Sequence, residues 1–143
     1  MTPSMPNEDI VLFNRIKRSL SGLPDTVTFT DGKIISCHML SRAVSIVFKI
    51  RCHDGFFCSR YRHSWVTTPN NNIIDLCPVA TVGGPIMYSN DPTSPAITLY
   101  TPVSTLCSSV KNESFEKAVK AIISSLEQNL EGGSQPCFTM SLK

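Results

Sequence analysis

Residues 63–76 read HSWVTTPNNNIIDL, and the fold can be worked out from this segment. β-branched and aromatic residues lie on both sides of a centre rich in asparagine, which is typical of two strands joined by a tight turn. The segment therefore predicts an antiparallel hairpin with strands at 63–67 and 73–76. Residues directly opposite each other in such a pair share one face of the sheet, so His63 and Asp75 are expected to lie side by side.

A helix is expected upstream of this hairpin, over residues 37–48. Its apolar side chains form one stripe at helical spacing, which consists of Met39, Leu40, Ala43, Val44 and Val47. Cys37 is the first residue of the segment and follows a stretch predicted to be a strand. The partial positive charge at a helix N-terminus favours the thiolate over the thiol. Cys37 is therefore the cysteine best placed to react as a nucleophile.

The rest of the chain completes a mixed α+β pattern. The expected elements are a helix from Asn7 to about Leu20, a hairpin over 26–36, a second hairpin with Asp54-Gly55 at its turn, a long loop after Pro78 ending in a strand at 97–100, a helix over 114–130 and a loose tail over 131–143. We expect a single domain spanning 1–143, with its core at about 7–130. In it an antiparallel sheet packs against the Cys37 helix and the helices near the two ends.

Composition argues against several classes of partner. The chain has 143 residues, a net charge of +2 and 17% charged residues, which gives no strong field for binding nucleic acid or a membrane surface. No apolar run approaches the ~20 residues that span a bilayer, and residues 1–9 lack the features of a secretory signal. We therefore expect a soluble, cytoplasmic protein with no nucleic-acid or membrane partner, whose cysteines are mostly reduced.

Cys37, His63 and Asp75 have the chemical types and predicted positions of a nucleophile, a base and an orienting carboxylate. An imidazole held by a carboxylate and aimed at a thiol is the general arrangement that activates a nucleophile for acyl transfer. Each residue alone also has a structural explanation, as a buried thiol, a packed histidine or an acceptor for turn amides. The order of the three along the chain favours the catalytic interpretation.

Three short pieces carry a resemblance to a known family: Ser36-Cys37-His38, His63-Ser64-Trp65 and Ile73-Ile74-Asp75. Together these pieces, which lie within residues 34–78, resemble the transglutaminase-like branch of the papain-like fold. The resemblance implies a compact core in which a Cys-bearing helix packs on an antiparallel sheet. It also implies thiol protease, deamidase or transglutaminase chemistry through an acyl-thioester on Cys37, with His63 as base and then acid, and Asp75 as its orienter.

The same resemblance gives supporting roles to nearby residues. His38 and Trp65 become candidates for the oxyanion or substrate side of the site, and residues 83–88 become candidates for the lining of its cleft. Because no glutamine precedes Cys37, backbone N–H groups at the helix start would bind the oxyanion. The implied substrate is an amide in a peptide or a protein, and no cofactor is needed. The sequence leaves the oligomeric state open.

Two other interpretations remain open. A papain-like module that has lost catalysis would keep its cleft and bind a peptide or protein partner. A zinc site would draw its ligands from a stretch that contains Cys52, His53, Cys58, His63 and Cys77. That stretch lacks cysteines at the usual two-residue spacing, and neighbouring residues of a strand point to opposite faces, so thiol chemistry is favoured over zinc binding.

Overall fold

The computed structural model describes residues 5–21, 23, 36–76, 85–94, 96–103 and 113–132. Its elements, in chain order, are α1 (Asn7–Leu20), α2 (Cys37–Phe48), β1 (Arg51–Phe57), β2 (Tyr61–Thr67), β3 (Ile73–Asp75), β4 (Ile86–Tyr88), α3 (Ala96–Leu99), β5 (Tyr100–Pro102) and α4 (Glu113–Gly132). The structure is compact and mixed α+β with one antiparallel sheet, which confirms the predicted class. Residues 26–35 of the predicted first hairpin and 133–143 of the predicted tail lie outside the described residues.

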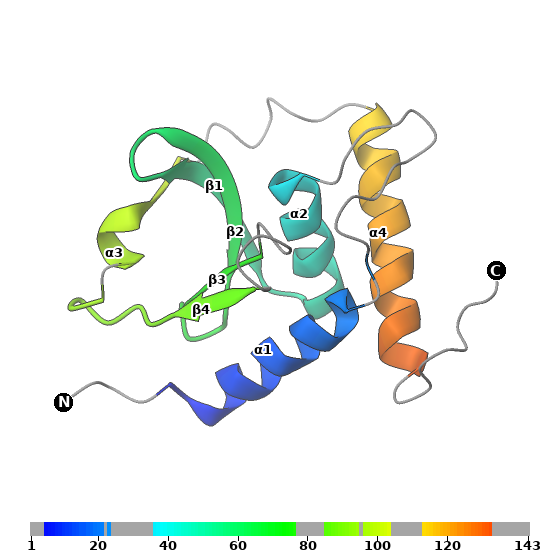
Figure 1. Ribbon diagram of the computed structural model, residues 1–143, viewed down its shortest axis with the longest axis horizontal. Helices are drawn as coiled ribbons and strands as arrows, with labels where there is room; N and C mark the ends of the chain where they lie inside the picture. Colours follow the sequence, from blue (N-terminus) through cyan, green and yellow to red (C-terminus); the bar gives the residue numbers. More distant parts are fainter. Residues whose placement is uncertain are drawn as a thin grey trace.

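Five strands form the sheet in the order β4-β3-β2-β1-β5, and all neighbours are antiparallel. The β1–β2 pair is the longest ladder, and Figure 1 shows it as a strongly curved ribbon. The curvature brings distant strands together on one face. Tyr88 of β4 and Tyr100 of β5 have ring centroids only 5.9 Å apart, although three strands separate them in the sheet.

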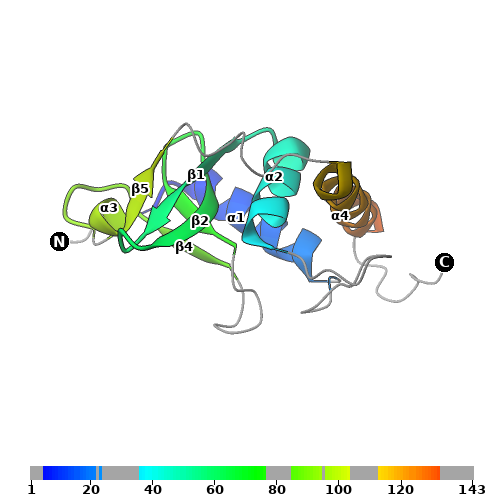
Figure 2. The same ribbon diagram turned by 90° about the horizontal axis from the view of Figure 1, so that it is seen from above.

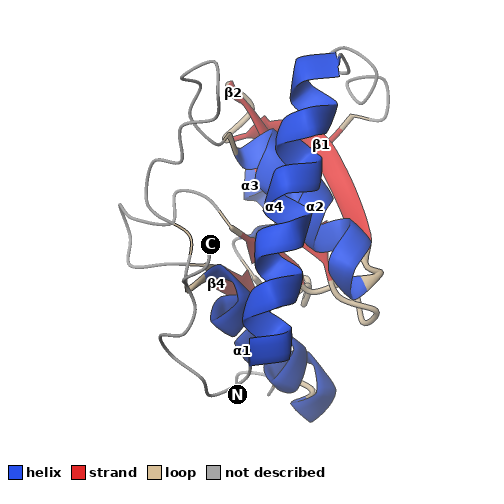
Figure 3. Ribbon diagram, turned by 90° about the vertical axis from the view of Figure 1, so that its right-hand side faces the viewer, coloured by secondary structure: helices blue, strands red, loops and turns tan. Residues whose placement is uncertain are grey.

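The long helices form layers on one face of the sheet. Figure 2 shows α1 and α2 between the sheet and α4, and Figure 3 shows α4 lying over α2 with β1 behind it. The main core fills the space between these layers, and its most buried members are Ile16, Leu20, Leu40, Ala43, Val44, Val66, Ile74, Leu76, Ala118, Ile122 and Leu126. The predicted α2 stripe is confirmed, because four of its members are buried and Val47 is partly buried against them. None of the described helices is long and apolar enough to cross a bilayer.

A second, smaller core lies on the other face of the sheet. It consists of Trp65, Ile73, Ala96 and Tyr100, with Phe57, Tyr88 and Leu99 packed against them. The two cores follow from strand alternation, since neighbouring residues of a strand point to opposite faces. Thus Val66 and Ile74 pack toward α2, whereas Trp65 and Ile73 pack into the aromatic core.

The buried carboxylate of Asp9 fastens α1 to the loop between β2 and β3. Asp9 is 1% exposed and accepts hydrogen bonds from Thr68 Oγ1 at 2.7 Å, Asn72 Nδ2 at 2.6 Å and Asn70 Nδ2 at 3.0 Å. Burial of a carboxylate is costly unless it is hydrogen-bonded, and these three donors supply that compensation. α1 begins at Asn7 as predicted, Pro6 precedes it, and no side chain caps the helix.

The predicted turn at Asp54-Gly55 is wrong, because both residues lie inside β1. The chain reverses instead at Cys58 and Ser59, whose φ angles are 56° and 57°. The N–H of Arg60 closes this turn by donating to the carbonyl of Phe57 at 3.2 Å. Two central residues with positive φ are the mark of a type I′ turn, which matches the twist of a hairpin even where glycine is absent.

Gly55 is needed inside β1 because β5 pairs with β1 at very short range at this position. A Cβ at residue 55 would lie 2.0 Å from the carbonyl oxygen of Thr101, so only glycine allows this approach. The predicted strand at 97–100 is also corrected, since 96–99 form α3 and the strand begins at Tyr100. Likewise, residues 86–88 of the predicted loop form β4, which pairs with β3. Residues 77–84 lie outside the described part of the chain.

Candidate active site

Cys37 is the first residue of α2 and is half-buried. Its position follows from Ser36, whose hydroxyl accepts a hydrogen bond from the N–H of Met39 at 3.2 Å. Serine is a preferred N-cap because its side chain satisfies an amide that the first helical turn leaves without a partner. The cap fixes the start of the helix, so that residue 37 lies at the positive end of the helix dipole.

His63 and Asp75 lie on β2 and β3 and are hydrogen-bonded to each other. His63 Nε2 is 2.9 Å from Asp75 Oδ1 and 3.0 Å from Oδ2. The predicted register, with the two residues directly opposite, is nevertheless wrong. The observed pairs are Val66↔Ile74 and Thr67↔Ile73, which makes Asp75 a diagonal neighbour of His63 on the same face.

The loop between β2 and β3 sets this register. The N–H of Thr68 donates to the carbonyl of Asn72 at 2.9 Å, so that residues 69–71 form the loop and Asn71, with φ 67°, ends it. A three-residue loop that ends in a left-handed residue is a common hairpin connection. Its centre at residue 70, rather than at residue 69, moves each cross-strand partner by two positions. A shift of two leaves every side chain on its original face, so the two site residues still meet.

The surroundings of His63 favour its charged form. Burial lowers the pKa of His63, but hydrogen bonds with Asp75 and Cys37, together with the charges of these groups, raise it to about 9. Because Asp75 occupies Nε2, Nδ1 is the ring atom left for the thiol. The structure thus brings Cys37, His63 and Asp75 into one continuous series of contacts, with the imidazole in the middle.

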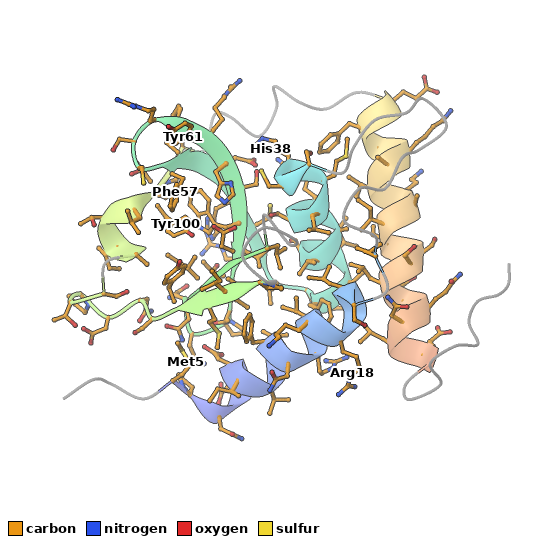
Figure 4. All side chains as sticks on the ribbon, in the orientation of Figure 1. Met5, Arg18, His38, Phe57, Tyr61 and Tyr100 are labelled. Atoms are coloured by element: carbon orange, nitrogen blue, oxygen red, sulfur yellow. The ribbon has the colours of Figure 1, made fainter. Side chains whose placement is uncertain are left out.

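Tyr100 is hydrogen-bonded to the carboxylate of Asp75. Its hydroxyl donates to Asp75 Oδ2 at 2.5 Å, and burial and the carboxylate raise the pKa of Tyr100 above its usual range. The His63 ring lies among aromatic side chains, at centroid distances of 5.9 Å from Phe57, 6.2 Å from Trp65 and 6.2 Å from Tyr100. Figure 4 shows Phe57 and Tyr100 together under the curve of the sheet. Trp65 is 2% exposed, so it packs beneath the histidine within the core.

His38 lies beside the site and contacts the strand that carries His63. Its Nδ1 is 2.6 Å from Ser64 Oγ, so two consecutive residues of α2 meet two consecutive residues of β2. Behind Ser64, its hydroxyl donates to Asp54, and Arg42 forms a two-pronged ion pair with the same carboxylate, at 3.0 and 2.5 Å. This group of four side chains links α2 to β1 and β2 next to the nucleophile candidate.

Sequence reasoning missed Tyr100, Ser64, Asp54 and Arg42. Ser64 carried a signal that was available: it is a polar residue on a predicted strand, next to residues expected to be buried, where a buried polar group needs a partner. Asp54 carried none, because its sequence context predicts a turn. Arg42 lies one helical turn after His38, which was a weaker signal of the same kind. Tyr100 carried none, because its contact with Asp75 depends on how far the sheet curves.

The cysteine- and histidine-rich stretch does not assemble as a zinc site in the part of the chain described. Cys52 packs against the main core, whereas His53 stacks on Trp65 on the opposite face, with centroids 6.0 Å apart. Cys58 is exposed in the β1–β2 turn, and Cys77 lies outside the described residues. Among described residues, no three side chains of the metal-binding types converge in a way that could hold an ion.

Comparison of the chain with protein-family models, with curated proteins and with solved structures finds no match.

Proposed function

We propose that this protein is a thiol-dependent amide hydrolase or acyl transferase that acts through a Cys37 acyl-thioester. The observation that carries the proposal is the continuous contact from Cys37 through His63 to Asp75. A nucleophile, a base and an orienting group in this order are the parts that acyl transfer requires. The compact α+β fold, with the cysteine at a helix start facing a histidine on an antiparallel strand, agrees with a papain-like, transglutaminase-like core.

The first half of the reaction forms the acyl-enzyme. His63 takes the proton of Cys37, and the resulting thiolate attacks the carbonyl carbon of an amide in a peptide or protein. The negative charge that develops on oxygen is stabilised by N–H groups in the first turn of α2, which helical hydrogen bonding does not use. The imidazolium of His63 then donates its proton to the nitrogen of the breaking C–N bond, and the amine leaves.

The second half releases the acyl group. Water or a second amine attacks the thioester carbonyl while His63 accepts its proton, and the Cys37 sulfur leaves as thiolate. Asp75 accepts a hydrogen bond from the Nε2 side of the ring throughout, which keeps the opposite nitrogen directed at the sulfur. Attack by water gives a protease or deamidase, and attack by an amine gives a transglutaminase-type transfer.

Capture of the acyl-enzyme tests the proposal. The protein is incubated with the p-nitrophenyl ester of benzyloxycarbonyl-glycine, an activated acyl donor, and its peptides are mapped by mass spectrometry. We expect the acyl group on the peptide that contains Cys37, and no acylation of that peptide in Cys37→Ala. The matched control is Cys58→Ala, which removes an exposed thiol and leaves the acylation of Cys37 intact. Acylation of Cys58 but not of Cys37 would contradict the proposal and favour a non-catalytic binding module.

A further inference from the structure

A network of hydrogen-bonded side chains beside the candidate site runs from Arg42 through Asp54 and Ser64 to the ring of His38. Asp54 is 5% exposed and forms the two-pronged ion pair with Arg42. Ser64 is fully buried and joins Asp54 to the ring of His38. The ion pair alone already connects α2 to β1. A buried ion pair contributes little net stability, so stability alone does not explain why the polar contacts continue through Ser64 to His38. These additional contacts therefore need another explanation.

The hydrogen-bonding capacities of these groups fix where the proton lies on His38. An ionised carboxylate only accepts hydrogen bonds, so the single hydroxyl proton of Ser64 must point to Asp54. The oxygen of Ser64 is then an acceptor toward His38, at 2.6 Å from Nδ1. It follows that Nδ1 carries a proton. In the neutral ring, Nε2 therefore has a lone pair and no hydrogen.

His38 is partly exposed next to the nucleophile candidate. The side chain of His38 is 26% exposed, and no hydrogen bond joins its Nε2 to any residue that the structure describes. Figure 4 shows His38 at the end of α2 that faces the β1–β2 pair. A fixed, partly exposed acceptor in this position can only bind a group that donates a hydrogen bond.

We propose that His38 is a substrate-binding residue whose Nε2 accepts a hydrogen bond from an N–H group next to the carbonyl that Cys37 attacks. The class of substrate is then a peptide-like acyl donor, with an amide N–H on the residue that becomes attached to the enzyme. This inference rests on the proposed function, since it assumes that Cys37 is the nucleophile. Arg42, Asp54 and Ser64 act through His38 and are positioning residues.

The proton position can be measured without any substrate. In an NMR spectrum that correlates ring nitrogens with ring carbon-bound protons, neutral His38 is expected as the Nδ1–H tautomer, whereas free histidine favours Nε2–H. The signals of His38 are assigned by their loss in His38→Gln. In Ser64→Ala the acceptor for Nδ1 is absent, and the ring is expected to shift toward the ordinary tautomer. An Nε2–H tautomer in the unmodified protein would overturn the inference.

A pair of acyl donors tests the substrate preference. Benzyloxycarbonyl-glycine and benzyloxycarbonyl-sarcosine p-nitrophenyl esters differ only in an N–H that becomes N–CH₃. We expect kcat/KM to favour the glycine ester by about three- to tenfold, the range for one neutral hydrogen bond. The preference should fall to near one in His38→Leu. It should survive in part in His38→Gln, whose amide oxygen can still accept.

The outcomes separate the two claims. If neither ester acylates Cys37 in the unmodified protein, the proposed function fails and this inference falls with it. If Cys37 is acylated but the preference is the same in the unmodified protein and in His38→Leu, the proposed function stands and the role of His38 is wrong. His38 is partly exposed, so both substitutions at this position are expected to leave the fold intact, and Ser64→Ala provides an independent second variant.

Discussion

At the residue scale, the charge on His63 decides what Cys37 can do. The pKa of about 9 lies above the value of 6.5 for an unperturbed histidine, so the imidazolium persists through neutral pH and is lost as pH rises through about 9. An imidazolium beside the sulfur favours the thiolate, and in the proposed reaction it would supply the proton for the leaving amine. Both effects arise because the His63 ring lies between the carboxylate of Asp75 and the sulfur of Cys37.

This charge state predicts different pH profiles for two reactions of the same cysteine. Turnover of an amide needs the imidazolium as an acid, so kcat should fall as pH rises through about 9. Alkylation of Cys37 by iodoacetamide needs only the thiolate and should not decline there. Both rates are measured on one preparation across pH 5–10. An alkaline decline of turnover near pH 6.5 would contradict the assigned state of His63, because it would indicate an unperturbed ring.

Asp75 and Tyr100 are predicted to contribute unequally to kcat/KM. Asp75→Asn removes the carboxylate that raises the pKa of His63, so kcat/KM should fall by about 10²–10⁴ and its alkaline limb should move to lower pH. Tyr100→Phe keeps the aromatic packing and removes one hydrogen bond to Asp75, so the loss should be about tenfold or less. The two variants serve as controls for each other in a steady-state pH profile. Equal losses in both would show that the carboxylate has no special role.

At the element scale, the loop that joins β2 to β3 was predictable in kind but not in detail. The composition of 69–72 identifies a turn, and the strands on either side follow from β-branched and aromatic residues. The number of residues in the loop depends on hydrogen bonds that the sequence does not show, and the register depends on that number. His63 and Asp75 still meet because side chains repeat every two residues. The prediction of a shared face was therefore more robust than the prediction of the partners.

Other errors at this scale have a common cause. Asp54-Gly55 has the composition of a turn, but Gly55 is needed where β5 approaches β1, and the turn itself uses Cys58 and Ser59. The three-residue strands β4 and β5 exist because neighbouring strands offer hydrogen-bonding partners. Such pairings are tertiary contacts, and local propensity does not contain them. In contrast, the bounds of α2 were predicted correctly because its apolar stripe is a local pattern.

Asp9 is predicted to contribute more to the free energy of unfolding than its exposed neighbour Glu8. Asp9→Ala leaves the side chains of Thr68 and Asn72 buried without their acceptor, which should lower the free energy of unfolding by about 3 kcal/mol. Glu8→Ala is the matched control, because Glu8 is exposed and makes one surface hydrogen bond to Asn70, so its loss should be about 0.5 kcal/mol or less. Urea unfolding followed by far-UV circular dichroism measures both. Similar losses in the two variants would mean that α1 is not anchored through Asp9.

Gly55→Ala is predicted to disturb the attachment of β5. The added methyl group would meet backbone atoms of Thr101, which cannot rotate away, so the free energy of unfolding should fall by about 1–3 kcal/mol. Ser59→Gly is the control in the same hairpin, because glycine adopts the positive φ of that turn without strain and should not destabilise the protein. The comparison uses the same urea titration. A Gly55→Ala protein as stable as the parent would show that β5 does not approach β1 this closely.

At the scale of the whole molecule, the candidate site lies where the helical layer meets the curved sheet. α2 supplies Cys37 and His38, β2 supplies His63 and Ser64, and the aromatic core on the far face supplies Tyr100. The α+β class and the meeting of His63 and Asp75 could be predicted because they depend on local patterns. The contacts of Tyr100 and of the Arg42–Asp54 pair could not, since they require the curvature of the sheet and the packing of α2 against it.

The central claim is that His63 keeps Cys37 ionised, and the most direct test is the pH dependence of Cys37 alkylation by iodoacetamide. An ordinary thiol with a pKa of about 8.5 reacts about tenfold more slowly for each pH unit below that value. We predict that Cys37 instead keeps a nearly constant rate between pH 8 and about pH 6, and that His63→Ala restores the tenfold decline. Exposed Cys58 is the reference within the same molecule, read from the same peptide map. If Cys37 declines tenfold per pH unit in the unmodified protein, and His63→Ala leaves its profile unchanged, the paired thiolate and the proposed chemistry are both contradicted.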